Sequence, residues 1–223
     1  MLVSTLFLVI FTFLIVFLMT LKLLRLNVAF EYDTVLLVLV LLVPLGLAMD
    51  FVHESGHAIW GAAFGGRVVY MQIAYFEIYP RLAVAPRFVL GLTEVEGIQT
   101  DFGRGFYLLG GALTTNIVSW LLALVMFRTK LGFKTKLGLR IMGVFGLLDL
   151  PFYVVFPQIG LCHWIIFGGC QPEPLIGARM MGLPDVFFYT CVLFTTLGLS
   201  FFYFESVWKR IQMSVRSLQT NKT

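Results

Sequence analysis

Long apolar stretches recur along this chain of 223 residues and constrain its fold more than any other feature. Hydrophobic residues make up 59% of the sequence and charged residues only 13%, about half the charged share of an ordinary soluble domain. A run of about 20 apolar residues is long enough to cross the hydrocarbon core of a bilayer as a helix. We therefore expect an all-α integral membrane protein, built as a single membrane domain over residues 1–223.

The apolar runs predict about five transmembrane helices, with six as the alternative count. The first covers residues 1–26, and because no basic residue precedes its apolar part we expect a retained anchor. The second runs from about residue 34 to 64, where Gly65 and Gly66 provide a stop signal. Three further helices are predicted at residues 105–127, about 137–156 and 185–208. Residues 157–184 are a predicted Gly/Pro-rich loop, whose apolar piece, 160–169, is too short to cross a membrane unaided. Residues 209–223 form a basic tail.

Residues 67–104 show a different pattern, rich in β-branched and aromatic side chains and punctuated by prolines. Such segments favour strands over helices. We expect a small β-hairpin or sheet at the membrane surface, directly after the second helix.

A His-Glu-x-x-His motif, HESGH, occupies residues 53–57 at the end of an apolar run whose only charge is Asp50. Two histidines four residues apart lie on one helical face and can direct nitrogens at a single ion. The glutamate beside the first can accept a proton from a metal-bound water. Because ionisable groups are costly in a membrane helix, we predict His53 and His57 as ligands of one Zn²⁺ per chain and Glu54 as the catalytic base.

A catalytic zinc usually has three protein ligands, so a third ligand must come from elsewhere. Asp149 is the preferred candidate, because a carboxylate within an apolar spanning segment needs a partner such as a cation. His163, Glu173 and Asp185 compete for this role, but each lies in or beside the Gly/Pro-rich loop, where water can solvate it. Asp50 shares the helical face of the motif, and it is either an acceptor that orients an imidazole or a group capped by a neighbouring helix.

These motifs together resemble the site-2 protease family of intramembrane zinc metalloproteases. The resemblance rests on HESGHA in a membrane helix, a β element after it, GGALTTN on the next span and LLDLP on the following one. It covers residues 34–156 and implies a three-helix catalytic core there, with Asp149 completing the zinc site and Asn116 binding substrate. Leu150 stands where the family has the glycine of its LDG motif, so the chain is expected to be a divergent member.

The resemblance implies zinc-dependent hydrolysis of peptide bonds in or near the transmembrane helices of membrane proteins. A substrate helix must unwind, which exposes backbone groups that lipid cannot satisfy. We hypothesise that residues 67–90 pair with the opened substrate by strand addition. Two alternatives stay open, namely a catalytically silent relative that binds metal or membrane partners, and a metal transporter.

The basic residues indicate orientation in the lipid bilayer and not binding to nucleic acid, because they make no stripe with interleaved aromatics. Placing loops alternately puts eleven of the 16 Lys and Arg residues on one side, which the positive-inside rule assigns to the cytoplasm together with the C-terminus. The HESGH end then faces outward, whereas site-2 proteases generally cut near the cytosolic face. The eleven are Lys22, Arg25, Arg128, Lys130, Lys134, Lys136, Arg140, Lys209, Arg210, Arg216 and Lys222.

Three cysteines, Cys162, Cys170 and Cys191, show no CxxC spacing. The odd count indicates neither a disulfide framework nor a cysteine zinc site, so we expect buried thiols.

Overall fold

The computed structural model describes residues 32–162 and 169–204. The first predicted span, His163 and the basic tail therefore lie outside the described residues. The chain divides into two compact units, one comprising Val38–Glu205 and the other the two chain ends, Met1–Leu37 with Ser206–Thr223.

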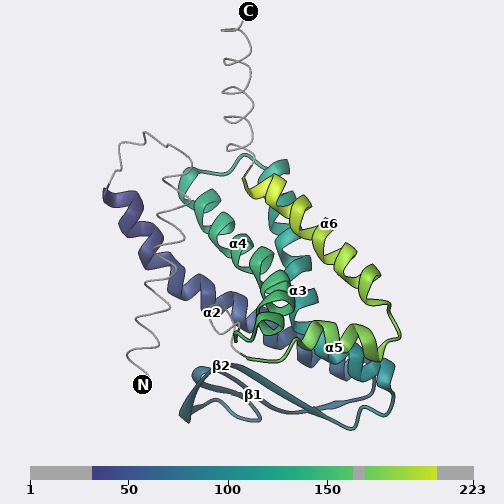
Figure 1. Ribbon diagram of the computed structural model, residues 1–223. Helices are drawn as coiled ribbons and strands as arrows, with labels where there is room; N and C mark the ends of the chain where they lie inside the picture. The colour runs from purple at the N-terminus through teal and green to yellow at the C-terminus, as the bar shows by residue number, and fades with distance from the viewer. Residues whose placement is uncertain (1–31, 163–168, 205–223) are drawn as a thin grey trace, which may run out of the picture. The chain divides into compact units, whose positions relative to one another are not determined.

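The helices and strands follow one another in a simple order (Figure 1). Helix α2 is followed by the two-stranded antiparallel sheet β1–β2, then by the long helices α3 and α4, a short 3-10 turn η1, the short helix α5 and the helix α6. Their bounds are α2 Tyr32–Ala63, β1 Arg67–Tyr79, β2 Ala83–Glu96, α3 Asp101–Arg128, α4 Phe133–Val155, η1 Phe156–Ile159, α5 Glu173–Met180 and α6 Asp185–Tyr203.

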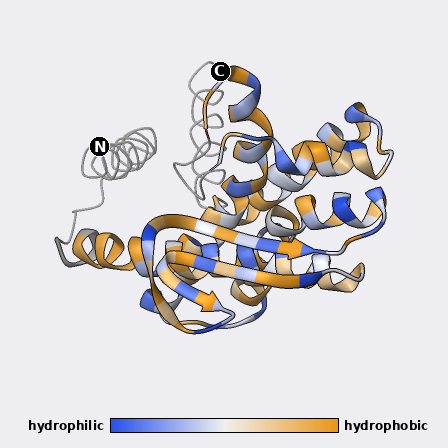
Figure 2. Cartoon of the chain, turned by 90° about the horizontal axis from the view of Figure 1, so that it is seen from below, coloured by the Kyte–Doolittle hydropathy of each residue, from blue (hydrophilic) through white to orange (hydrophobic). Residues whose placement is uncertain are grey.

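Within the described residues, four helical segments are long and apolar enough to cross a membrane, one fewer than the five predicted for the whole chain. They are Leu36–Ala63, Asp101–Arg128, Phe133–Ile159 and Asp185–Tyr203, which match the second to fifth predicted spans. Their outer faces stay apolar: Phe127 and Phe194 are each 71% exposed and Val186 is 79% exposed. Figure 2 shows hydrophobic residues, in orange, on many of the helical turns. Large apolar side chains on the outside are consistent with lipid as the surrounding solvent.

The predicted stop after α2 and the predicted hairpin are both confirmed. Gly65 has a positive φ of 82°, and the N–H groups of Gly65 and Gly66 donate to the carbonyls of Ala62 and Gly61. This is the Schellman arrangement, which turns the chain sharply out of a helix. Strand β2 then folds back on β1, from Arg67 opposite Glu96 to Glu77 opposite Ala83.

Two features of the predicted loop 157–184 differ from the prediction. Residues 173–180 form helix α5, because prolines suit a first helical turn and two of its apolar residues, Leu175 and Ala178, find a buried face. Cys162 and Cys170 are joined in a disulfide, while Cys191 is exposed, so the expectation of three buried thiols was wrong. An odd number of cysteines excludes a structure in which every cysteine is in an intramolecular disulfide, but it does not exclude a single disulfide between two cysteines that are close in sequence.

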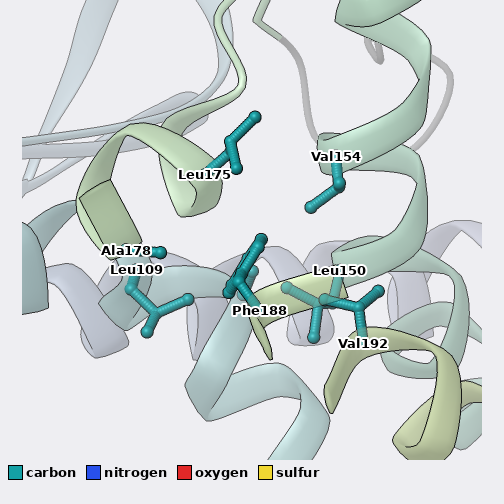
Figure 3. Close-up of a cluster of buried hydrophobic side chains, with 8 residues drawn as sticks. Leu109, Leu150, Val154, Leu175, Ala178, Phe188 and Val192 are labelled. Carbon is teal, nitrogen blue, oxygen red and sulfur yellow. The ribbon is translucent and has the colours of Figure 1, made fainter. Parts of the chain in front are cut away.

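Helix α5 is anchored in a core where α3, α4 and α6 meet. Figure 3 shows this cluster, in which side chains from the four helices point toward one another. Gly105 and Gly177 permit the close approach of α3 and α5, because a Cβ on either one would meet the carbonyl oxygen of the other. The cluster consists of Leu109, Ala112, Leu150, Val154, Leu175, Ala178, Phe188 and Val192.

We predict that Gly177→Ala destabilises the protein, because its new methyl group would overlap the Gly105 carbonyl. Overpacking of this kind costs about 1–3 kcal/mol, which should lower the melting temperature in detergent by several degrees. Gly138→Ala is the matched control, since a Cβ there meets only Leu45 at 3.9 Å. Equal melting temperatures for the two variants would contradict the proposed contact between α3 and α5.

Candidate metal centre

The two histidines of HESGH turn the same ring nitrogen toward each other. Nε2 of His53 lies 3.1 Å from Nε2 of His57, and both side chains are buried. Nδ1 of His57 donates to the backbone carbonyl of Tyr107 on α3 at 2.7 Å. Because a neutral imidazole that donates through Nδ1 keeps its lone pair on Nε2, His57 presents Nε2 as a ligand atom.

His53 is held in the same tautomer by a carboxylate from α4. Its Nδ1 lies 2.8 Å from Oδ2 of Asp149, which also accepts a 2.6 Å hydrogen bond from the Thr115 hydroxyl. Asp149 is 1% exposed, and its other oxygen, Oδ1, has no hydrogen-bond partner among the described residues. A carboxylate on the far nitrogen of a metal-binding imidazole is the usual orienting partner in metal sites.

Glu54 lies where α2 meets strand β2. Its backbone carbonyl accepts a hydrogen bond from the Thr93 hydroxyl, and its carboxylate lies against Gly91. A Cβ at Gly91 would overlap this carboxylate and would come within 2.9 Å of Asp50 Oδ1, so only glycine lets the strand pass this close. Neither oxygen of Asp50 has a hydrogen-bond partner among the described residues, and the imidazole acceptor found beside His53 is Asp149 instead.

A cavity of about 430 Å³ opens beside Glu54 and His57. One wall is the stretch of β2 from Phe88 to Thr93, and the others come from α3, α4 and the segment that leads into α5. Glu173, the first residue of α5, also lines the cavity. Its Oε2 lies 3.9 Å from Nε2 of His57.

Glu173 is the site residue whose position the sequence least revealed. The sequence places it as a competing ligand in a Gly/Pro-rich loop, where water can solvate it. In the structure its side chain is only 34% exposed, and this burial raises the pKa of its carboxyl group. The sequence feature that predicts a helix here is the Pro-Glu-Pro start followed by apolar residues at 175 and 178. This pattern is typical of a short amphipathic helix.

The other predicted residues lie away from the cavity. The side-chain oxygen of Asn116 accepts a hydrogen bond from Thr195 at 2.8 Å, which ties α3 to α6. Asn116 is not among the residues that line the cavity. Asp185 forms a two-contact ion pair with Arg179 at 2.6 and 2.9 Å on the exposed surface, so its charge is already matched.

The histidine pair fits a zinc ion. Ligand atoms around a tetrahedral zinc lie about 3.3–3.4 Å apart when each bond is about 2.0–2.1 Å long, close to the 3.1 Å between the two Nε2 atoms. The same atoms crowd Gly111 of α3, where an added Cβ would overlap both. Within residues 32–162 and 169–204, no set of three or more His, Cys, Asp or Glu side chains is already gathered as metal ligands.

Comparison with known proteins adds no relative. No protein-family model, curated protein or solved structure matches the chain. The resemblance to site-2 proteases therefore rests on the motifs alone and stays a prediction.

We predict that Gly111→Ala weakens zinc binding, because its methyl group would displace both Nε2 atoms. Disturbing the groups around a metal ligand typically lowers affinity about 10–100-fold, and we expect a loss at least this large. Competition with a chromophoric chelator measures the affinity, with Gly138→Ala as the helical-glycine control. Wild-type affinity in a folded Gly111→Ala protein would contradict a metal site between these histidines.

Proposed function

We propose that this protein is an intramembrane zinc metalloprotease that hydrolyses peptide bonds in or near the transmembrane segments of membrane proteins. The observation that carries the proposal is the facing pair of Nε2 atoms of His53 and His57, with Glu54 and His57 lining one cavity. The site-2 protease resemblance of residues 34–156 points the same way.

The residues divide the work of peptide hydrolysis between them. His53 and His57 would hold the zinc through Nε2, while Asp149 and the Tyr107 carbonyl fix the two rings by accepting from Nδ1. A bound zinc would polarise the scissile carbonyl and acidify water. Glu54, buried beside the two histidines, would take the proton from the attacking water and return it to the leaving amine.

The cavity wall formed by β2 suits an extended peptide. Residues 88–93 of this strand line the cavity next to Glu54 and His57. A substrate helix that unwinds inside a membrane leaves its N–H and C=O groups unsatisfied. A strand beside the cleavage site offers partners for these groups, which supports substrate binding by strand addition.

The distribution of buried charge favours an enzyme over a metal transporter. Among the described residues, the buried charged or imidazole side chains are Asp50, His53, Glu54, His57 and Asp149, all gathered at this site. A transport path needs such groups at successive depths on several helices. A silent metal-binding relative would have no need of the Glu54 carboxylate in the cavity.

We predict that Glu54→Gln abolishes cleavage while zinc stays bound, because the amide cannot accept the proton. The loss of a general base typically lowers the rate about 10²–10⁴-fold. The measurement pairs cleavage of a transmembrane model substrate in detergent micelles with zinc content, and Glu96→Gln, at the far end of β2, is the carboxylate control. Undiminished cleavage by Glu54→Gln would exclude this mechanism.

We also propose that the C-terminus lies in the cytoplasm and that the cavity opens on the opposite side. The positive-inside count places eleven of the 16 basic residues with the C-terminus. The Cys162–Cys170 disulfide, next to the cavity residue Gly169, is an independent support, because disulfides form mainly outside the reducing cytoplasm.

Thiol labelling of intact cells tests this orientation. In a Cys191→Ser background, a cysteine placed at exposed Thr135, in the first turn of α4 between Lys134 and Lys136, should react with an impermeant maleimide only after permeabilisation. A cysteine at exposed Gln99, at the sheet end, should react in intact cells. The reverse pattern would place the cavity on the cytoplasmic side.

A further inference from the structure

Asp149 and Glu173 occupy opposite sides of the histidine pair. Asp149 contacts His53 through Nδ1, whereas Oε2 of Glu173 lies 3.9 Å from Nε2 of His57. The resemblance to site-2 proteases implies Asp149 as the third zinc ligand. The geometry around the two imidazoles separates the roles of these carboxylates.

Asp149 cannot ligate a metal at Nε2 while it holds Nδ1 of the same ring. The two nitrogens of an imidazole point apart, so an oxygen 2.8 Å from Nδ1 lies roughly 6–7 Å from an ion bound at Nε2. The second oxygen of a carboxylate is only about 2.2 Å from the first, which still leaves it more than about 4 Å from that ion. A zinc–oxygen bond requires about 2.0–2.2 Å. Thr115 further fixes Asp149 by donating to the same oxygen.

Glu173 is on the correct side and near the correct distance. Its Oε2 needs to approach His57 Nε2 by only about 0.5 Å to reach the ligand separation of a tetrahedral zinc site. It lines the same cavity as His57 and Glu54, which is where a metal-bound water must meet substrate. Tyr153, also at the cavity, hydrogen-bonds to the Glu173 side chain.

The fold also fixes where Glu173 lies. It is the first residue of α5, whose next residues, Pro174 and Leu175, are buried. Two turns of this helix are held against α3 by the Gly105–Gly177 contact and by the apolar cluster of Figure 3. A ligand on an anchored helix keeps its position without relying on a loop.

We propose that Glu173 is the third zinc ligand, and that Asp149 is a positioning residue which holds His53 through Nδ1. This inference rests on the proposed zinc site and changes its ligand set from two histidines and an aspartate to two histidines and a glutamate. The residues of the site then come from helices α2 and α5, with α4 supplying the support.

Zinc affinity and the visible spectrum of the cobalt-substituted protein test the assignment on purified full-length protein. We expect Glu173→Gln to weaken zinc binding by more than about 100-fold and to shift the Co²⁺ absorption bands, because a ligand is lost. We expect Asp149→Asn to weaken binding about 10–100-fold, as loss of an orienting partner does, and to leave the band positions unchanged. Asp185→Asn removes a nearby exposed carboxylate and should match the wild type.

The outcomes separate this inference from the proposed function. If the wild-type protein binds neither zinc nor cobalt, both the assignment of Glu173 and the zinc protease proposal are wrong. Wild-type binding together with an unaltered affinity and spectrum in Glu173→Gln would overturn the assignment of Glu173 and leave the zinc protease proposal in place. Loss of the metal bands in Asp149→Asn would return the ligand role to Asp149.

Discussion

The candidate site depends on two hydrogen bonds to Nδ1 atoms. The Asp149 carboxylate accepts from His53 and the Tyr107 carbonyl accepts from His57, so both rings present Nε2 to the same point. Without these acceptors, the imidazoles of a HESGH helix could rotate or change tautomer, and their spacing along α2 alone would not aim them. The facing arrangement of the two Nε2 atoms is therefore a tertiary property, set by α3 and α4, of a motif that lies wholly in α2.

Small residues let the other elements come close enough to make these contacts. Ser119 donates to the Gly143 carbonyl, and a Cβ at Gly146 would overlap the Ser119 hydroxyl, so α3 and α4 approach closely at these positions. Gly91 likewise lets β2 lie close to the Glu54 carboxylate, because a Cβ at this position would overlap it. In a bilayer, where lipid is as apolar as a leucine side chain, packing of this kind replaces the hydrophobic effect as the source of helix association.

The sequence predicted the parts of this structure that depend on local pattern. Apolar length marked the helices, the Gly65-Gly66 pair marked the end of α2, and β-branched residues marked the hairpin. It also identified His53, Glu54 and His57 as neighbours, because four-residue spacing on a helix is fixed geometry. The sequence could not decide between Asp149 and Glu173, since which nitrogen a carboxylate meets depends on how α4 and α5 pack against α2.

The burial of Asp149 does not by itself make it a metal ligand. A carboxylate in an apolar span needs a partner, and a cation is only one of the groups that can meet this need. A donating imidazole and a hydroxyl serve equally well, and Asp149 has both in His53 and Thr115. Burial therefore indicates that a charged group is paired, but it does not reveal whether the pair binds a metal or only aims the side chain that does. The cavity is a complementary guide, because a hydrolytic metal would have to meet both water and substrate. Glu173 lines it and neither His53 nor Asp149 does, so the lining supports Glu173 only together with the 3.9 Å between its Oε2 and Nε2 of His57.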